Sequence, residues 1–169
     1  MKLLLRAWRI EDASALQGCA DDWEIARQLR DVFPHPYTLA DAQSYLSFCL
    51  SRPAERMIAC AIEADGALAG SIALTRGMDV YRGSAELGYW LDRSQWKKGI
   101  MSEAVRQMCQ KGFAQWDIIR VYAEPFARNV SSRAVLEKNG FVLEGHLRKS
   151  VLKEGQFLDS CIYGLLREQ

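Results

Sequence analysis

Residues 95–104, QWKKGIMSEA, are of types that can hold an anion at the start of a helix. Apolar residues recur at helical spacing after them, which predicts a helix over residues 100–116. The first turn of a helix leaves backbone N–H groups without partners at the positive end of the dipole. Gly99 lets an anion approach these amides closely, and Lys97 and Lys98 add positive charge. A glycine that only permits a tight turn, beside two solvated lysines, explains the same residues equally well.

Two familiar nucleotide-binding loops do not fit this stretch. A P-loop has the pattern G-x-x-x-x-G-K-[ST], whereas here both lysines precede the glycine. The dinucleotide fingerprint has three spaced glycines after a strand, and only Gly99 is present. The sequence therefore favours an anion that is held by the helix start without either loop.

Glu86 is a second residue that can do chemistry. It lies in AELGYWL, residues 85–91, which predicts a strand. Strand alternation places Glu86 on one face and Leu87, Tyr89 and Leu91 on the other, so a buried face can coexist with a ligand-facing carboxylate. A carboxylate that faces solvent or pairs with a neighbour is the alternative.

Asn129 and Ser132 form an N-x-x-S pattern at the start of a predicted helix over residues 131–138. Both residue types are common helix caps, and capping of this helix is one interpretation of the pattern.

The elements around these residues predict one mixed α/β domain over residues 1–169. Alternation and turn residues predict strands over residues 3–7, 57–63, 68–75, 85–91, 119–123, 141–152 and 157–166. Helical spacing predicts helices over residues 12–29 with a break near Gly18, 39–50, 100–116 and 131–138. Pro34 and Pro36 exclude a helix between the first two, and Thr38 with Asp41 predicts a capping box.

The composition is that of an ordinary globular chain, and it argues against some classes of binding partner. The 169 residues carry a net charge of +1, too little to attract nucleic acid or an anionic membrane. No apolar run approaches the ~20 residues of a membrane span, and charges interrupt the N-terminus too early for a signal peptide. Five scattered cysteines and two distant histidines predict a cytoplasmic protein with reduced thiols and no metal.

Several stretches together resemble the GCN5-related N-acetyltransferase (GNAT) family, and most of all its RimJ/RimL-type branch, which acetylates ribosomal-protein N-termini. These are AELGYWL, WKKGIMSEA at residues 96–104, NVSSRAVLEKNGF at residues 129–141, the opening L-x-L-R-x-W and the closing DSCIYGLL. The family loop has the form Q/R-x-x-G-x-G/A. Here Trp96 stands at its first position and Met101 at its last.

The resemblance implies a single-domain α/β (α+β) GNAT fold. Its central sheet would be mixed, mostly antiparallel, of about seven strands, flanked by helices and splayed between the fourth and fifth strands to admit acetyl-CoA. Backbone amides of the loop would bind the pyrophosphate, and the strand at residues 85–91 would pair with the pantetheine. The implied cofactor contacts are Leu91, Lys97, Lys98, Gly99, Ile100, Met101, Ser102, Asn129 and Ser132.

The resemblance also implies direct attack of a primary amine on the thioester, without metal. Glu86 is the candidate carboxylate for deprotonating the amine, directly or through water, and Ser132 the candidate acid toward the CoA thiolate. Many family members carry a tyrosine acid seven residues after the asparagine, where this chain has Leu136. Both histidines are far from any cysteine in sequence, so no acyl-enzyme is expected.

The resemblance also implies that the acceptor amine contacts the first helices and the loop that follows them. A Pro-stiffened loop whose aromatic residues pack on the core is the alternative. The candidate contacts are Trp23, Arg30, Asp31, His35 and Tyr37.

Three functional alternatives follow. The acceptor is a protein or peptide N-terminal α-amine or a small molecule of the aminoglycoside or polyamine type, or the chain is a non-catalytic acyl-CoA sensor. Met101 and Leu136 fit the sensor. A homodimer is compatible with the resemblance.

Overall fold

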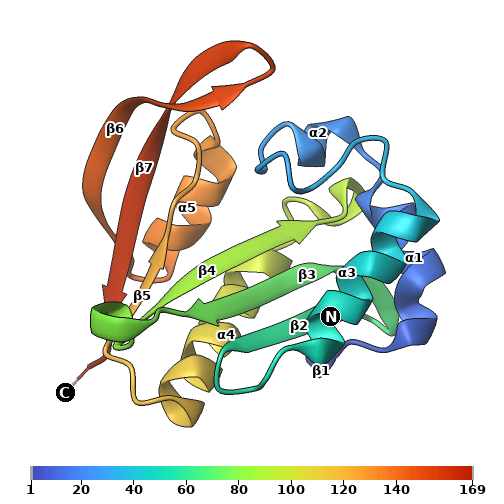
Figure 1. Cartoon of the computed structure of the whole chain (residues 1–169), viewed down its shortest axis with the longest axis horizontal. Helices are drawn as coiled ribbons and strands as arrows, with labels where there is room; N and C mark the ends of the chain where they lie inside the picture. The colour runs from blue at the N-terminus through green and yellow to red at the C-terminus, as the bar shows by residue number, and fades with distance from the viewer. Residues whose placement is uncertain (1, 169) are drawn as a thin grey trace.

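A single seven-stranded sheet runs through the computed structural model, which describes residues 2–168 (Figure 1). Its order is β1-β2-β3-β4-β5-β7-β6, and every neighbouring pair is antiparallel except β4 and β5. The strands are β1 (Leu3–Ala7), β2 (Met57–Ala64), β3 (Ala67–Arg76), β4 (Ser84–Leu91), β5 (Arg120–Ala123), β6 (Val142–Lys153) and β7 (Gln156–Leu166). The predicted mixed, mostly antiparallel sheet is confirmed.

The helices agree with prediction except near the N-terminus. They are α1 (Ala13–Ala20), α2 (Trp23–Ala26), α3 (Leu39–Ser51), α4 (Ile100–Gln115) and α5 (Val130–Lys138), with 3₁₀ turns η1 (Ile10–Asp12), η2 (Asp79–Tyr81) and η3 (Arg93–Gln95). The predicted break near Gly18 is wrong, because Gly18 lies inside α1 and the chain breaks at Asp21 and Asp22. Asp22 is extended, and its side chain accepts from the Glu24 amide, which favours a helix start over a continuous helix.

Helices cover both faces of the sheet. Alternate β2 residues Ile58, Cys60 and Ile62 join α4 in one buried cluster, while Ala61 joins α1 and α3 in another. In β4, Leu87 and Leu91 are buried in the α4 cluster and Tyr89 packs against it, whereas Trp90 packs against the α1/α3 cluster. The predicted alternation is confirmed, and it places Glu86 on the α1/α3 face.

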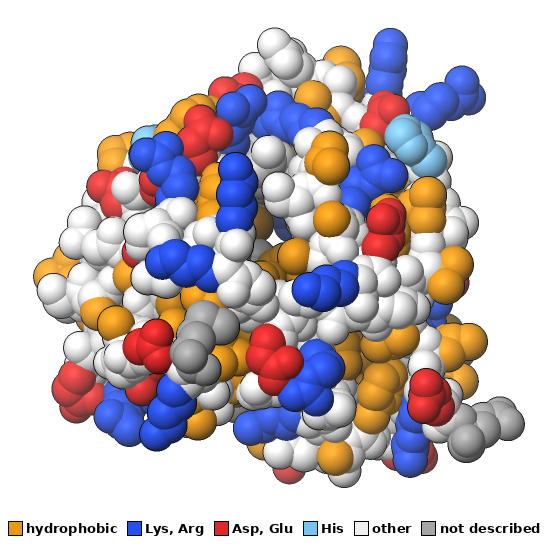
Figure 2. Space-filling model, turned by 180° about the vertical axis from the view of Figure 1, so that it is seen from behind, with side chains coloured by type: hydrophobic (Ala, Val, Ile, Leu, Met, Phe, Trp, Pro, Cys, Tyr) orange, Lys and Arg blue, Asp and Glu red, His pale blue; other side chains and the backbone are white. Residues whose placement is uncertain are grey.

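The sheet splays between β4 and β5. In the described structure only Ser84, Ala85 and Glu86 of β4 pair with β5, so the rest of the strand has no partner on that side. Figure 1 shows β5, β6, β7 and α5 leaning away from β4. Seen from behind, the surface is hollowed near its middle at the corresponding place, with Lys and Arg side chains around the hollow (Figure 2). The predicted splay is confirmed.

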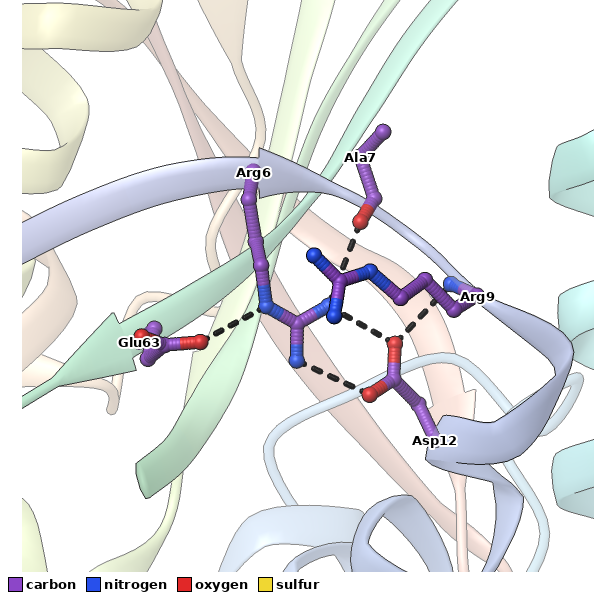
Figure 3. A network of polar contacts seen from close by, with 5 residues as sticks. All are labelled: Arg6, Ala7, Arg9, Asp12 and Glu63. Carbon is purple, nitrogen blue, oxygen red and sulfur yellow. Dashed lines mark hydrogen bonds and ion pairs between the residues drawn. The ribbon is translucent and has the colours of Figure 1, made fainter. Parts of the chain in front are cut away.

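An ion-pair network fixes the first strand to its surroundings (Figure 3). Arg6 of β1 donates to both carboxylate oxygens of Asp12, at 2.8 Å each, and to Glu63 of β2 at 2.7 Å. Asp12 also accepts from the Arg9 amide at 2.9 Å. The hydrogen bond from Arg6 lowers the pKa of Asp12, and burial opposes this only in part.

Candidate active site

The loop between β4 and α4 presents backbone amides at the start of a long helix. The indole Nε1 of Trp96 donates to the Leu91 carbonyl at 2.8 Å and closes the loop against the end of β4. Gly99 is the N-cap of α4 with φ 77° and ψ 0°, and no side chain caps the helix. The first amides of α4, from Ile100 onward, therefore have no intrahelical acceptor and can donate to a phosphate.

The side chains of this loop divide into buried and exposed ones. Ile100 and Met101 are 1% and 8% exposed and pack in the core, so only their backbone groups can reach a cofactor. Lys97 and Lys98 are exposed, and the Lys98 ammonium donates to Gln95 at 3.2 Å. At this position the groups available to an anion are thus the backbone amides at the start of α4 and the two exposed lysine side chains.

Ser102 and the end of α5 connect the loop to the second half of the candidate site. Ser102 Oγ accepts from Asn139 Nδ2 at 3.2 Å. Asn139 is the C-cap of α5 and Ser102 lies in the first turn of α4, so this hydrogen bond joins the end of α5 to the start of α4. Asn129, at the other end of α5, accepts from the Ser132 amide at 3.2 Å and caps the helix, as the capping alternative predicted.

Ser132 faces the splayed part of β4. Its Oγ lies 2.8 Å from the hydroxyl oxygen of Tyr89, a residue past the last β4–β5 pair. Leu136 is fully buried, so the position of the family's usual tyrosine acid is part of the core. Sequence reasoning missed Tyr89, although its alternation with Glu86 already assigned it to the face opposite the carboxylate.

Glu86 and Ser132 lie on opposite faces of β4. Glu86 accepts from Arg30 at 2.5 Å, and its register partner on β5 is Tyr122. Burial raises the pKa of Tyr122, and the negative charge of Glu86 raises it further. This arrangement separates a carboxylate on the α1/α3 face from hydroxyl groups on the α4/α5 face, with the splay between them.

The predicted acceptor residues do not all reach this site. Trp23 and His35 contact each other with ring centroids 5.4 Å apart, and His35 lies 3.6 Å from Asp21. Tyr37 is 4% exposed and packs against Phe33, so its ring belongs to the core, as the packing alternative predicted. Of the predicted set, Arg30 and Asp31 line a cavity next to Glu86.

That cavity has a volume of about 160 Å³ and joins segments that are far apart in sequence. Its lining residues are Arg30, Asp31, Glu124, Phe126, Val151, Leu152 and Lys153. The Lys153 side chain is 6% exposed and donates to Asp31 at 2.8 Å. Glu124 accepts from the Ser160 hydroxyl at 3.0 Å and makes no ion pair with another residue between 2 and 168.

Sequence reasoning missed Glu124 and Lys153. The alternation of β5 carries a signal for Glu124, because it follows Tyr122 by two residues on the face that Glu86 shares. Lys153 stands in a predicted turn, where a lysine is ordinarily solvated, and no local pattern indicates its burial.

One Cys–His contact does form across β6 and β7, although the two residues are far apart in sequence. The Cys161 sulfur lies 3.9 Å from His146 Nδ1, and His146 Nε2 lies 2.7 Å from Asp159. Cys161 is fully buried, so its sulfur cannot reach a thioester that enters from solvent. The contact gives no support to an acyl-enzyme.

Two further observations concern metals and membranes. Between residues 2 and 168, no three or more His, Cys, Asp or Glu side chains gather in a way that could hold a metal ion. No helix in the same range combines the length and the apolar character needed to cross a membrane.

Comparison with known proteins identifies the family. The family model for the acetyltransferase (GNAT) domain matches residues 2–142. The uncharacterized N-acetyltransferase p20 of Bacillus licheniformis is 28% identical over 173 residues, which cover 99% of this chain and 94% of that protein. The putative ribosomal N-acetyltransferase YdaF of Bacillus subtilis is 34% identical over 105 residues, 62% of this chain and 57% of that protein.

The fold agrees with solved structures. RimL, the ribosomal L7/L12 alpha-N-protein acetyltransferase in complex with coenzyme A, superposes with a TM-score of 0.88 at 23% identity, over 98% of this chain and 94% of that one. The amides at the start of α4 and the splay beside β4 fit a cofactor with a pyrophosphate and a linear arm. With the family match over residues 2–142, this chain belongs to the GNAT family and is an acetyl-CoA-dependent N-acetyltransferase.

Proposed function

We propose that this enzyme acetylates the α-amine at the N-terminus of a protein or peptide. The observation that carries this proposal is the cavity lined by Glu124, Arg30 and Lys153 on the Glu86 side of the splay. Its volume of about 160 Å³ is below the ~300 Å³ at which pockets begin to enclose drug-sized molecules. A cavity of this size accepts one end of a larger molecule, as a chain terminus would present.

The charges around the cavity support the same class of acceptor. Glu124, with no cationic partner among the described residues, can pair with the ammonium form of one amine. Arg30 and Lys153 are already paired with Glu86 and Asp31, so of the charges on the cavity wall only Glu124 is left to pair with an ammonium group among the described residues. Polyamines and aminoglycosides carry several ammonium groups, whereas a peptide terminus carries one.

The names of two similar proteins point in this direction as well. YdaF is described as a putative ribosomal N-acetyltransferase, and RimL as an alpha-N-protein acetyltransferase of ribosomal L7/L12. An α-amine has a pKa of about 8, so part of it is neutral at pH 7 without a strong base. The Arg30 guanidinium that holds Glu86 is therefore compatible with turnover of such an acceptor.

Within this proposal the residues of the site have distinct roles. Amides from Gly99 to Ser102 hold the pyrophosphate of acetyl-CoA, assisted by Lys97 and Lys98. Glu86 or a water beside it takes the proton of the amine, and Ser132 donates toward the sulfur that leaves. The amine attacks the thioester carbonyl of acetyl-CoA directly.

The test compares acceptors and one pair of variants. The rate of formation of acetylated product is measured by mass spectrometry for three acceptors at equal concentration. These are short peptides with free N-termini, spermidine and an aminoglycoside. We expect peptide turnover to exceed both others by at least tenfold. Replacing Glu124 with Gln should raise the peptide KM by about tenfold, the effect of a lost charge-assisted hydrogen bond.

Glu55→Gln is the matched control, because Glu55 is exposed and lies outside the cavity. Equal turnover of spermidine and peptide, or the same KM change in both variants, would contradict the proposed acceptor. A thermal shift with acetyl-CoA that persists in Glu124→Gln separates loss of the acceptor site from loss of the fold.

The proposal extends to location and assembly. Five free cysteines and a ribosomal-protein type of acceptor suit the cytoplasm. Fractionation of cells with an antibody against the chain tests this location. Light scattering at the enzyme concentration of the activity assay gives the molar mass and so distinguishes a monomer from a homodimer.

A further inference from the structure

The hydroxyl of Tyr89 is held in an unusual place for a strand residue. Tyr89 lies on the part of β4 that has left β5, and its ring packs against the α4 cluster. Its oxygen lies 2.8 Å from Ser132 Oγ, a contact in which either hydroxyl can donate, and 3.3 Å from the Ser132 carbonyl, to which only the phenol can donate. The contact with Oγ is the shorter of the two. Ser132 is the only residue that Tyr89 contacts through a hydrogen bond of its side chain among residues 2–168.

This contact joins two elements that flank the cofactor cleft. Ser132 stands in the first turn of α5, and Tyr89 stands on the unpaired edge of β4. A hydroxyl group buried at an apolar surface is ordinarily hydrogen-bonded, and here the partner is another hydroxyl that faces the same cleft. A hydrogen bond between the two hydroxyls can therefore fix the orientation of the Ser132 O–H, which in a serine without a partner rotates freely about the Cβ–Oγ bond.

We propose that Tyr89 is a positioning residue for Ser132, donating its O–H to Ser132 Oγ so that the serine O–H points at the sulfur of CoA. This inference rests on the proposed acid role of Ser132.

The step balances without a further reactant. After the amine attacks, the bond between the acyl carbon and the sulfur breaks, and the sulfur keeps the electron pair. Ser132 gives its proton to the sulfur. The proton that the amine gave to Glu86 or its water is released to solvent, and Ser132 regains a proton from solvent, so both groups return to their starting states. The Tyr89 hydrogen bond stabilises the negative charge that develops on Ser132 Oγ during this transfer.

Tyr89 stays protonated while it does this. Burial raises the pKa of its hydroxyl above the ordinary value, and the hydrogen bond with Ser132 opposes the shift only in part. A neutral phenol is therefore a fixed donor over the working pH range, and it contributes no competing titration.

The first experiment does not depend on an acceptor. Affinities for CoA and acetyl-CoA are measured by calorimetry from pH 7 to pH 10, since only CoA has a thiol that titrates, near pH 8.5. If the Ser132 O–H meets the sulfur, CoA should bind progressively tighter than acetyl-CoA as the thiolate forms. We expect this gain to fall by about tenfold in Tyr89→Phe and to vanish in Ser132→Ala.

The second experiment is a double-mutant cycle on turnover of a peptide. Tyr89→Phe should lower kcat by about tenfold and leave the KM for acetyl-CoA unchanged, and Ser132→Ala should lower kcat further. The double variant should be no slower than Ser132→Ala, because Tyr89 acts through the serine. Tyr81→Phe is the matched control, since Tyr81 is 73% exposed on η2.

Phe keeps the ring of Tyr89, and a thermal melt verifies the fold of each variant. Wild-type pH dependence of CoA binding in Tyr89→Phe, or additive losses in the double variant, would overturn the inference. Loss of peptide turnover in the wild type would contradict the proposed acceptor and leave the calorimetric result to decide the role of Tyr89.

Discussion

Replacing Gly99 with Ala tests whether the backbone at the start of α4 holds the cofactor. Gly99 has φ 77°, in the left-handed region that an L side chain rarely adopts. A Cβ built there meets no atom within 4 Å, so the substitution introduces conformational strain without a clash inside the protein. The variant therefore isolates the backbone conformation from packing.

The size of the effect follows from that conformation. An L-residue in the left-handed region costs about 1–2 kcal/mol. If the loop keeps its shape, the strain appears in stability and lowers Tm by roughly 2–8 °C for a chain of this length. If the loop relaxes instead, the amides from Ile100 onward move, and the same energy weakens acetyl-CoA binding by about fivefold to thirtyfold.

Calorimetric titration with acetyl-CoA and a thermal melt without ligand together measure both terms. Gly18→Ala is the control, because Gly18 lies inside α1, its φ is not positive and a Cβ there also meets nothing within 4 Å. A Gly99→Ala protein with wild-type Tm and wild-type acetyl-CoA affinity would refute the reasoning. It would show that neither the strained conformation nor the amides it places matter to the cofactor.

Two further predictions concern stability and acceptor choice. Asp12→Asn should destabilise the fold by about 2–4 kcal/mol at pH 7, because it breaks a largely buried ion pair with Arg6. The folded-state pKa of Asp12 is lowered, so its contribution is complete above the ordinary value of 3.8 and is lost as the pH falls through the folded value. Urea unfolding from pH 7 to pH 2 should therefore show a shallower acid loss in the variant, and parallel curves would contradict this. Arg30→Gln should lower the KM for cationic acceptors by about twofold to fivefold, most for spermidine, because it leaves the Glu86 carboxylate beside the cavity without its cationic partner. An unchanged ratio between spermidine and peptide would count against the charge argument.

Local patterns predicted most elements, because each depends on nearby residues. The capping box of Thr38 and Asp41 and the alternation of β4 both stand as expected. Gly18 misled because a glycine is tolerated inside a short amphipathic helix, while the extended backbone of Asp22 ends it a few residues later. The error is one of boundary and left the topology correct.

The candidate site could be predicted only where one segment supplies it. The loop before α4 is contiguous, and both its glycine and its helix could be identified from spacing. The cavity instead needs Arg30, Glu124 and Lys153 from three distant segments, and their meeting depends on the order of strands in the second half of the sheet. The Tyr89–Ser132 contact likewise depends on how far β4 and α5 lean apart.

Two adjacent residues of opposite charge tie the two halves of the splayed sheet together. Arg30 holds Glu86 on the β4 side, and Asp31 holds Lys153 at the end of β6. The distance between the two halves, which part beyond the β4–β5 pairing, therefore depends on the position of the loop that carries Arg30 and Asp31. Any ligand that widens the splay must alter the acceptor cavity, and by thermodynamic reciprocity an acceptor that displaces the loop alters the affinity for that ligand by the same factor. The affinities for cofactor and acceptor are thus coupled through this one dipeptide.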